Sequence, residues 1–143
     1  MDASEIEAAF GKTEDSPELS SLMAKVGQTK RPKLVDGVGE VKLPKLGLRL
    51  AFKPENPKSS TLILSGITFH AGSEEDYQAF GGALPKGLTL ADSRAVVRNK
   101  LGAPTKAVDR YRIDHWDSGD RRLSVEYEEA EDKIAKVYLG FQR

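Results

Sequence analysis

The sequence of 143 residues has no cysteine, only two histidines and one tryptophan, and no excess of charge, because 22 basic residues balance 22 acidic ones. The lack of cysteine excludes disulfides, thiolate zinc sites and cysteine nucleophiles, and it suits a reducing compartment. Proteins that bind nucleic acid through its phosphates usually carry a basic excess. We therefore expect neither a disulfide scaffold nor direct binding to nucleic acid.

Long apolar runs are also missing, and we do not expect the opening residues to be a secretory leader. The opening residues, MDASEIEAAFGK, place acids where a signal peptide carries Lys or Arg. No segment approaches the roughly 20 apolar residues of a membrane-spanning helix. We expect no membrane partner and a cytoplasmic location. The length and the hydrophobic content of 38% predict a single domain over residues 1–143 with its own core.

What the chain does contain is a repeated apolar pattern. A shift of 75 residues, the distance from Leu22 to Val97, places apolar positions on apolar positions without a gap. The matched pairs include Leu22 with Val97, Gly27 with Gly102, Leu48 with Leu123, Leu50 with Val125 and Leu62 with Val137. Repetition at a fixed period is typical of duplicated structural units. It predicts units at about 4–69 and 89–143, joined by a connector at 70–88.

Local patterns predict helices at 4–10, 17–26 and 92–101, and strands at 33–42, 47–53, 61–69, 108–117, 121–128 and 133–141. Gly37 and Gly39 interrupt the first of these strands. Ser4 with Glu7 has the spacing of a capping box, Ser16 precedes a proline at a helix start, and Thr89 or Asp92 caps the third helix. The predicted fold class is α+β: a tandem repeat of a helix-plus-antiparallel-sheet unit, with the helices packed on one face of the sheet.

Catalytic and metal-binding patterns are not recognisable. His70 and His115 fall in predicted strands, and neither has a partner at the spacing of metal ligands. No glycine-rich loop continues into Lys-Ser or Lys-Thr, so there is no P-loop. The acidic run from Glu128 to Asp132 lacks the spacing of a calcium loop and is interpreted as a hairpin tip. We expect no catalytic residue, no metal, no cofactor and no enzymatic activity.

A candidate binding surface lies on the second predicted sheet. If Leu123, Val125 and Tyr127 face the helix, the opposite face carries Glu126, Glu128 and Tyr138. Asp114 and Trp116 join them if Ile113 points inward. Exposed Trp and Tyr among charges are typical of protein-binding hot spots. The candidate partner-binding residues are therefore Asp114, Trp116, Asp117, Glu126, Glu128 and Tyr138. The alternative for Trp116 is packing into the core.

The motifs between Tyr77 and Tyr138 resemble a group of small bacterial proteins. These motifs are GGALPKGL, SRAVVRNKLGAP, a Trp-bearing hairpin, LSVEY and IAKVYL. The unit of one helix, LGxP and three strands also resembles the beta-lactamase inhibitor protein, itself a tandem repeat, and small outer-membrane assembly lipoproteins. The chain departs from the lipoproteins because it has no signal peptide and no lipidation cysteine.

The resemblance implies a non-enzymatic immunity protein that binds and neutralises a cognate toxin in the cytoplasm. If that toxin were a nuclease with a basic site, the acids of residues 114–120 and 126–132 would mimic phosphate. Two alternatives stay open. The chain could be an inhibitor or adaptor of another cytoplasmic protein, or a small ligand-binding protein or enzyme.

Overall fold

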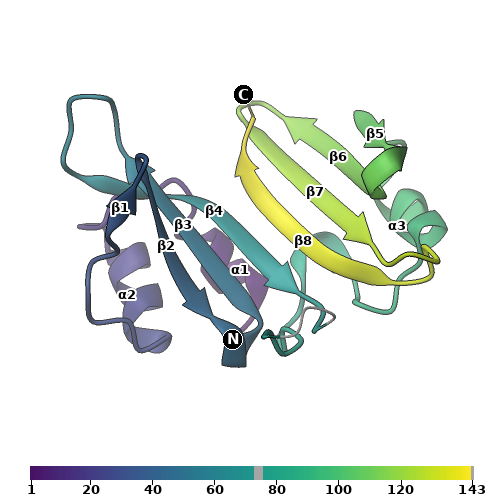
Figure 1. Cartoon of the computed structure of the whole chain (residues 1–143), viewed down its shortest axis with the longest axis horizontal. Helices are drawn as coiled ribbons and strands as arrows, with labels where there is room; N and C mark the ends of the chain where they lie inside the picture. The colour runs from purple at the N-terminus through teal and green to yellow at the C-terminus, as the bar shows by residue number, and fades with distance from the viewer. Residues whose placement is uncertain (73–75, 143) are drawn as a thin grey trace.

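The computed structural model describes residues 1–72 and 76–142. Within them, eight antiparallel strands form one sheet in the order β1-β2-β3-β4-β8-β7-β6-β5 (Figure 1). The strands are Leu34–Val35 (β1), Val38–Leu43 (β2), Leu48–Pro54 (β3), Leu62–His70 (β4), Lys106–Val108 (β5), Ile113–Ser118 (β6), Arg121–Tyr127 (β7) and Ile134–Phe141 (β8). Strands β4 and β8 pair in the middle, so each half of the chain supplies four neighbouring strands. The predicted α+β class with an antiparallel sheet is confirmed.

The helices are few and short. They are Ala3–Glu7 (α1), Pro17–Lys25 (α2) and Arg94–Leu101 (α3), with 3-10 turns at Pro44–Leu46 (η1), Pro85–Gly87 (η2) and Asp109–Tyr111 (η3). In Figure 1, α1 and α2 lie behind the first four strands, and α3 lies behind the other end of the sheet. No helix in the described residues has the length and apolar character needed to cross a membrane.

Helix starts follow the local chemistry only in part. The Ser16 hydroxyl accepts from the Leu19 amide at 3.2 Å with Pro17 at the first helical position, as predicted. The capping box at Ser4 is wrong, because α1 begins at Ala3 after Asp2 and has no side-chain cap. The third helix is capped by Ser93, whose hydroxyl accepts from the Val96 amide.

Two predicted strands are interrupted by turns. Residues 33–42 form the hairpin β1–β2, in which Asp36 and Gly37 have φ of 53° and 79°. Asp-Gly suits such a tight turn, since both central residues need positive φ. Residues 108–117 are broken by η3 and by Arg112, which has φ of 56°. The glycines at 37 and 39 already indicated the first interruption, whereas the sequence predicted one continuous strand over 108–117.

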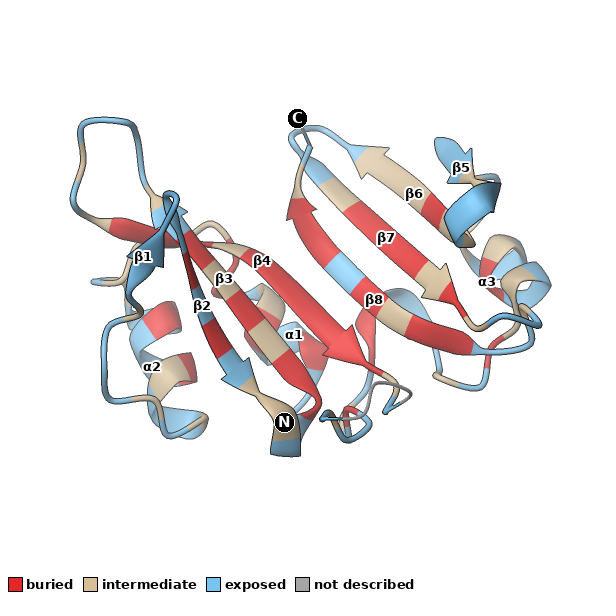
Figure 2. Ribbon diagram, viewed as in Figure 1, coloured by how far each residue is buried: buried red, intermediate tan, exposed pale blue. Residues whose placement is uncertain are grey.

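The core lies between the sheet and the helices. In Figure 2, buried and more exposed residues alternate along β2 and β3, which indicates one covered face and one open face. The apolar side chains that alternate along the third strand of each half are all buried: Leu48, Leu50 and Phe52 in β3, and Leu123, Val125 and Tyr127 in β7. The phase expected for residues 121–128 is therefore confirmed, and β3 shows the same alternation.

The connector between the halves is packed rather than free. Phe80 and Leu84 are buried, and the Phe80 ring meets Phe69 edge-on at 4.9 Å between centroids. Tyr77 stacks on the buried His70 ring at 3.8 Å. Residues 73–75 of the connector lie outside the described residues.

Candidate functional site

Strand β6 has the opposite phase to the one inferred from sequence. Asp114 pairs with Val125 and Trp116 pairs with Leu123, and side chains of directly paired residues share a face of the sheet. Both residues therefore point toward the helices. The expectation that Asp114 and Trp116 lie on the open face is wrong; Ile113 and His115 lie there instead. The alternative of packing applies to Trp116, which lies against the core.

Asp114 is fully buried and is held by three neighbours. Arg94 donates to both carboxylate oxygens, at 2.7 Å to Oδ1 and 3.2 Å to Oδ2. Arg98 also donates to both, at 2.8 Å to Oδ1 and 2.9 Å to Oδ2. The Tyr127 hydroxyl donates to Oδ2 at 3.0 Å. A buried carboxylate needs such partners, because desolvation without compensation is costly.

These contacts shift the acidity of Asp114. Burial by itself raises the pKa of the Asp114 carboxyl, but the hydrogen bonds from Arg98, Arg94 and Tyr127 outweigh it and hold that pKa well below 3.8. Burial beside this carboxylate also raises the pKa of the Tyr127 hydroxyl. The carboxylate therefore stays ionised and fastens α3 to strands β6 and β7. This explains why two arginines lie one helical turn apart in the SRAVVR motif.

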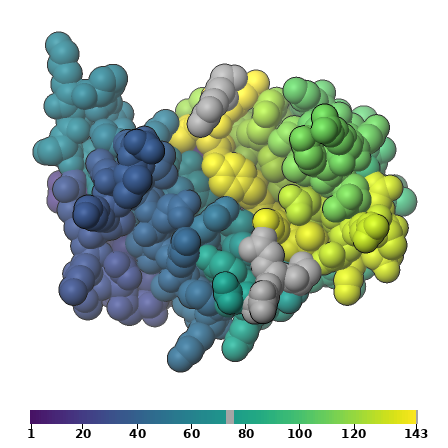
Figure 3. All heavy atoms as spheres, viewed as in Figure 1, coloured from purple at the N-terminus to yellow at the C-terminus, as the bar shows by residue number. Residues whose placement is uncertain are grey.

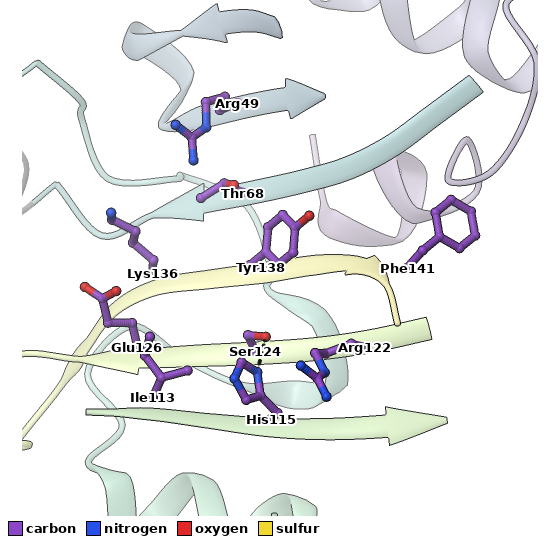
Figure 4. Close-up of a pocket in the computed structure, with 10 residues that line it drawn as sticks. All are labelled: Arg49, Thr68, Ile113, His115, Arg122, Ser124, Glu126, Lys136, Tyr138 and Phe141. Carbon is purple, nitrogen blue, oxygen red and sulfur yellow. Dashed lines mark hydrogen bonds between the residues drawn. The ribbon is translucent and has the colours of Figure 1, made fainter. Parts of the chain in front are cut away.

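The open face of the sheet carries a hollow beside Tyr138 and Glu126. A pocket of about 420 Å³ is lined by residues of β3, β4, β6, β7 and β8 (Figure 4). They are Arg49, Thr68, Ile113, His115, Arg122, Ser124, Glu126, Lys136, Tyr138 and Phe141. A second hollow along β2 and β3 shares Arg49, Thr68, Tyr138 and Phe141 with it. Together they form one groove across the junction of the two halves.

Tyr138 forms the centre of this groove. Gly66 and Gly140 are paired across β4 and β8, and the Tyr138 ring lies over both. A Cβ on Gly140 would lie 2.5 Å from the Tyr138 Oη, and one on Gly66 would lie 3.0 Å from it. The two glycines thus let the ring lie close to the sheet, and 39% of Tyr138 stays exposed. Figure 3 shows the side chains of β8, in yellow, between those of the first half and the green ones of the second half.

His115 and Ser124 form a polar pair at one side of the groove. The His115 Nδ1 and the Ser124 Oγ are 2.6 Å apart, and Figure 4 shows them on neighbouring strands. Burial lowers the pKa of the His115 imidazole below 6.5, and the Arg122 guanidinium lowers it further. A neutral imidazole next to a hydroxyl can donate one hydrogen bond to a bound group or accept one from it.

Among the described residues, the charged side chains on the open face are mainly basic. Strand phase and register place these charged side chains there among the described residues: Lys42, Arg49, Lys53, Lys106, Arg122 and Lys136 with Glu40, Asp117 and Glu126. Arg122 donates to both oxygens of Asp117, at 2.6 Å and 3.0 Å. Arg49 has no hydrogen bond or ion pair within the described residues. The groove therefore offers a cation beside an aromatic ring.

The six predicted partner-binding residues are consequently separated. Tyr138 and Glu126 lie on the open face, and Asp117 lies at its border, held by Arg122. Asp114 and Trp116 lie on the opposite face. Glu128 is half-buried after the end of β7, and its neighbour Glu131 is bonded to Arg94 on the helix side. The acidic run is thus a turn between β7 and β8, as its interpretation as a hairpin tip predicted.

Sequence reasoning missed the first-half residues of the groove. Arg49 and Ala51 alternate with the core residues of β3, so the alternation already placed them on the open face. What it could not show was that β4 pairs with β8 and so brings Arg49 next to Tyr138.

Within residues 1–72 and 76–142, no group of three or more His, Cys, Asp or Glu side chains could hold a metal ion. Comparisons with known proteins add no relative. No protein family, no curated protein and no solved structure matches this chain. The resemblance to immunity proteins therefore stays a prediction, and the geometry of the chain carries the functional argument.

Proposed function

We propose that this chain is a non-enzymatic protein-binding module that binds its partner with the open face of the sheet. The observation that carries the proposal is the exposed Tyr138 ring supported on Gly66 and Gly140 at the centre of the groove. Tyrosine provides a large contact area at small cost in conformational entropy, and such anchors dominate binding energies. The sheet beneath the ring already holds it in place, so little conformational entropy is lost when a partner binds.

The charges around Tyr138 indicate the chemistry of the partner surface. The open face has six cationic side chains and three acidic ones among the described residues. Arg122 is already engaged by Asp117, and Lys136 also has an interaction within the chain. Complementary charge favours encounter with an acidic surface. This differs from the basic nuclease site considered from the sequence, because the acids that would mimic phosphate lie mostly outside this face.

The resemblance extends the proposal to the biological role. An immunity protein that neutralises a cognate toxin in the cytoplasm would need a broad, preformed surface of this kind. The same surface would serve an inhibitor or adaptor of another cytoplasmic protein. The two roles differ in the partner's activity, not in the geometry of this chain.

We also propose that the chain arose by duplication of one unit. Helix α2 precedes β1–β4, helix α3 precedes β5–β8, and the two sets of strands meet at β4 and β8 in mirrored order. One feature departs from a simple copy. The 3-10 turn η1 lies between the second and third strands of its half, whereas η3 lies between the first and second. A set of related sequences whose two halves align to each other would support duplication.

The binding role can be tested with the product of the neighbouring gene. Expression of a toxic neighbour should arrest growth, and co-expression of this chain should restore it. Tyr138→Ala should abolish the rescue, and Arg49→Glu should reduce it. Tyr111→Ala is the matched control, since Tyr111 is also exposed, at 56%, but lies in η3. Rescue by the Tyr138→Ala variant at normal protein levels would contradict the proposed surface.

One observation favours a second candidate, a small ligand-binding protein or enzyme. His115 and Ser124 lie in a pocket of about 420 Å³, within the range of small-molecule sites. A hydrolytic turnover that His115→Ala abolishes without unfolding the chain would support this candidate over the binding module.

A further inference from the structure

A separate hollow lies on the helix-covered face of the sheet, opposite the groove around Tyr138. Its volume is about 430 Å³, and it is bordered by α1, η2, the end of α3 and the strands β6–β8. In Figure 1, α1 and α3 stand apart behind the sheet, and residues of both helices line this hollow. The volume falls within the range of small-molecule sites, about 300–1,000 Å³.

The floor of this hollow is apolar. Leu123 and Leu139 come from neighbouring strands and are each 8% exposed, so only a small part of each reaches the hollow. Trp116 and Leu101 form one wall. The Trp116 Nε1 donates to the Gly102 carbonyl at 3.2 Å, which fixes the ring at the end of α3. The walls can therefore hold a flat or aliphatic group without rearrangement.

Two of the charges at the rim are already engaged. Lys100 donates to the Asp92 carboxylate at 2.7 Å and to the Gly87 carbonyl at 3.0 Å. Asp117 accepts two hydrogen bonds from Arg122. Their charges are balanced within the chain, so the net charge of the rim depends on the remaining side chains.

The remaining rim charges are Glu7, Lys86 and Arg121. Burial raises the pKa of the Glu7 carboxyl, although Lys86 and Arg121 oppose this. The Arg121 guanidinium lies 4.8 Å from the centroid of the Phe10 ring, which holds it over the core. Two cations against one partly desolvated carboxyl make the rim attractive to an anion.

Lys86 occupies a position that suits glycine better than lysine. The turn from Pro85 to Leu88 closes with a hydrogen bond of 3.1 Å from the Leu88 amide to the Pro85 carbonyl. Its central residues, Lys86 and Gly87, have φ of 58° and 72°. Turns with two left-handed residues favour Gly, Asn or Asp. Residues that break a local rule in this way are concentrated at functional positions.

We propose that this hollow binds a small amphiphilic anion. Its apolar body would lie against Trp116, Leu123 and Leu139, and its acidic group would lie between Lys86 and Arg121. The site is on the opposite face from the groove around Tyr138, so it goes beyond the proposed partner binding and does not depend on it.

The probe for this site is 1-anilinonaphthalene-8-sulfonate, which combines a planar apolar body with one negative charge. Fluorescence titration of the full chain should show one saturable site. N-phenyl-1-naphthylamine has the same rings without the sulfonate and should bind more weakly by about threefold or more, as expected for one partly exposed ionic contact.

Three variants separate a built site from a merely apolar surface. Lys86→Gly should weaken sulfonate binding by about threefold or more, while raising the urea midpoint, because glycine relieves the left-handed turn. Glu7→Gln should strengthen binding, since it removes the competing carboxylate. Lys45→Ala is the matched control, as Lys45 also follows a proline in a 3-10 turn but lies outside the hollow, and it should bind as the parent does.

The opposite results would overturn the proposal. Equal binding of the neutral and sulfonate probes, or parental sulfonate affinity in Lys86→Gly, would show an apolar surface that fits a protein side chain rather than an anion. The absence of saturable binding would do the same. Rescue in the growth assay would be unaffected in each case, so the two proposals fail separately.

Discussion

Replacement of Asp114 by Asn tests the central electrostatic feature of the second half. The two side chains have nearly the same shape, so the exchange removes the charge without opening a cavity. Both carboxylate oxygens accept from guanidinium groups, Oδ1 from Arg94 and Arg98, and Oδ2 from the same two residues and Tyr127. In either orientation of the new Asn amide, its NH₂ group, which can only donate, would face the N–H groups of Arg94 and Arg98.

The expected cost follows from burial. Asp114 is 0% exposed, and the Arg94 side chain is only 11% exposed. Breaking a buried pair by removing one partner typically costs about 3–5 kcal/mol. That is a large part of a total stability of roughly 5–15 kcal/mol. Arg98→Gln should cost less, about 1–2 kcal/mol, because the Arg98 side chain is 39% exposed and Arg94 still holds the carboxylate.

Urea unfolding measured by Trp116 fluorescence is a suitable assay, because the Trp116 Nε1 is bonded to the end of α3. The double variant Asp114→Asn with Arg98→Gln should cost less than the two single costs added, since the residues share one network. A loss below about 1 kcal/mol for Asp114→Asn would refute the argument, since it would show that the carboxylate is not buried with its partners.

The same network predicts a pH dependence. The folded pKa of Asp114 lies below its ordinary value of 3.8, so its contribution is complete above that value and is lost as the pH falls below it. The parent should lose stability steeply in acid, and Asp114→Asn should show a shallower slope over the same range. Equal slopes in the two proteins would contradict the assignment of the low pKa to Asp114.

Further outcomes concern packing. Gly47→Ala should destabilise strongly, because a Cβ there would lie 2.5 Å from the Phe80 amide nitrogen, whereas Gly119→Ala meets no atom within 4 Å and should show only the cost of its positive φ, about 1–2 kcal/mol. Leu123→Ala should cost about 2–5 kcal/mol. Each is checked by urea titration, and a Gly47→Ala loss no larger than that of Gly119→Ala would count against the packing of the connector on β3.

The fold was largely accessible from the sequence because the apolar periodicity is strong. Alternation in residues 47–53 and 121–128 placed the core side chains correctly, and Ser16 marked a helix start. Gly37 already indicated an interruption of residues 33–42, and the structure has a turn there. The break at 109–112 could not be predicted, because it depends on Arg112 in the left-handed region and nothing in an arginine side chain indicates positive φ.

The phase of β6 shows a different limit. Hydrophobicity placed Ile113 inside and Asp114 outside, whereas the structure does the reverse. The turn of the β6–β7 hairpin determines the observed phase. Ser118 pairs with Arg121, which leaves a two-residue turn and puts Trp116 opposite the inward-facing Leu123. A buried Asp becomes acceptable only when its two arginine partners on α3 are taken into account. Burial of a charge is thus a property of the network and not of the residue.

This inversion also changes the chemistry available to a partner. With Asp114 turned inward, the carboxylate that would have faced the partner is used to fasten α3. His115 lies on the open face beside Ser124, and the β4–β8 pairing places Arg49 of the first half in the same groove. The surface expected from the second half alone was acidic. Among the described residues, the surface that both halves share is mainly basic and has Tyr138 at its centre. Since the groove exists only where the halves meet, its shape depends on the register of β4 and β8, in which Gly66 and Gly140 leave room for the Tyr138 ring.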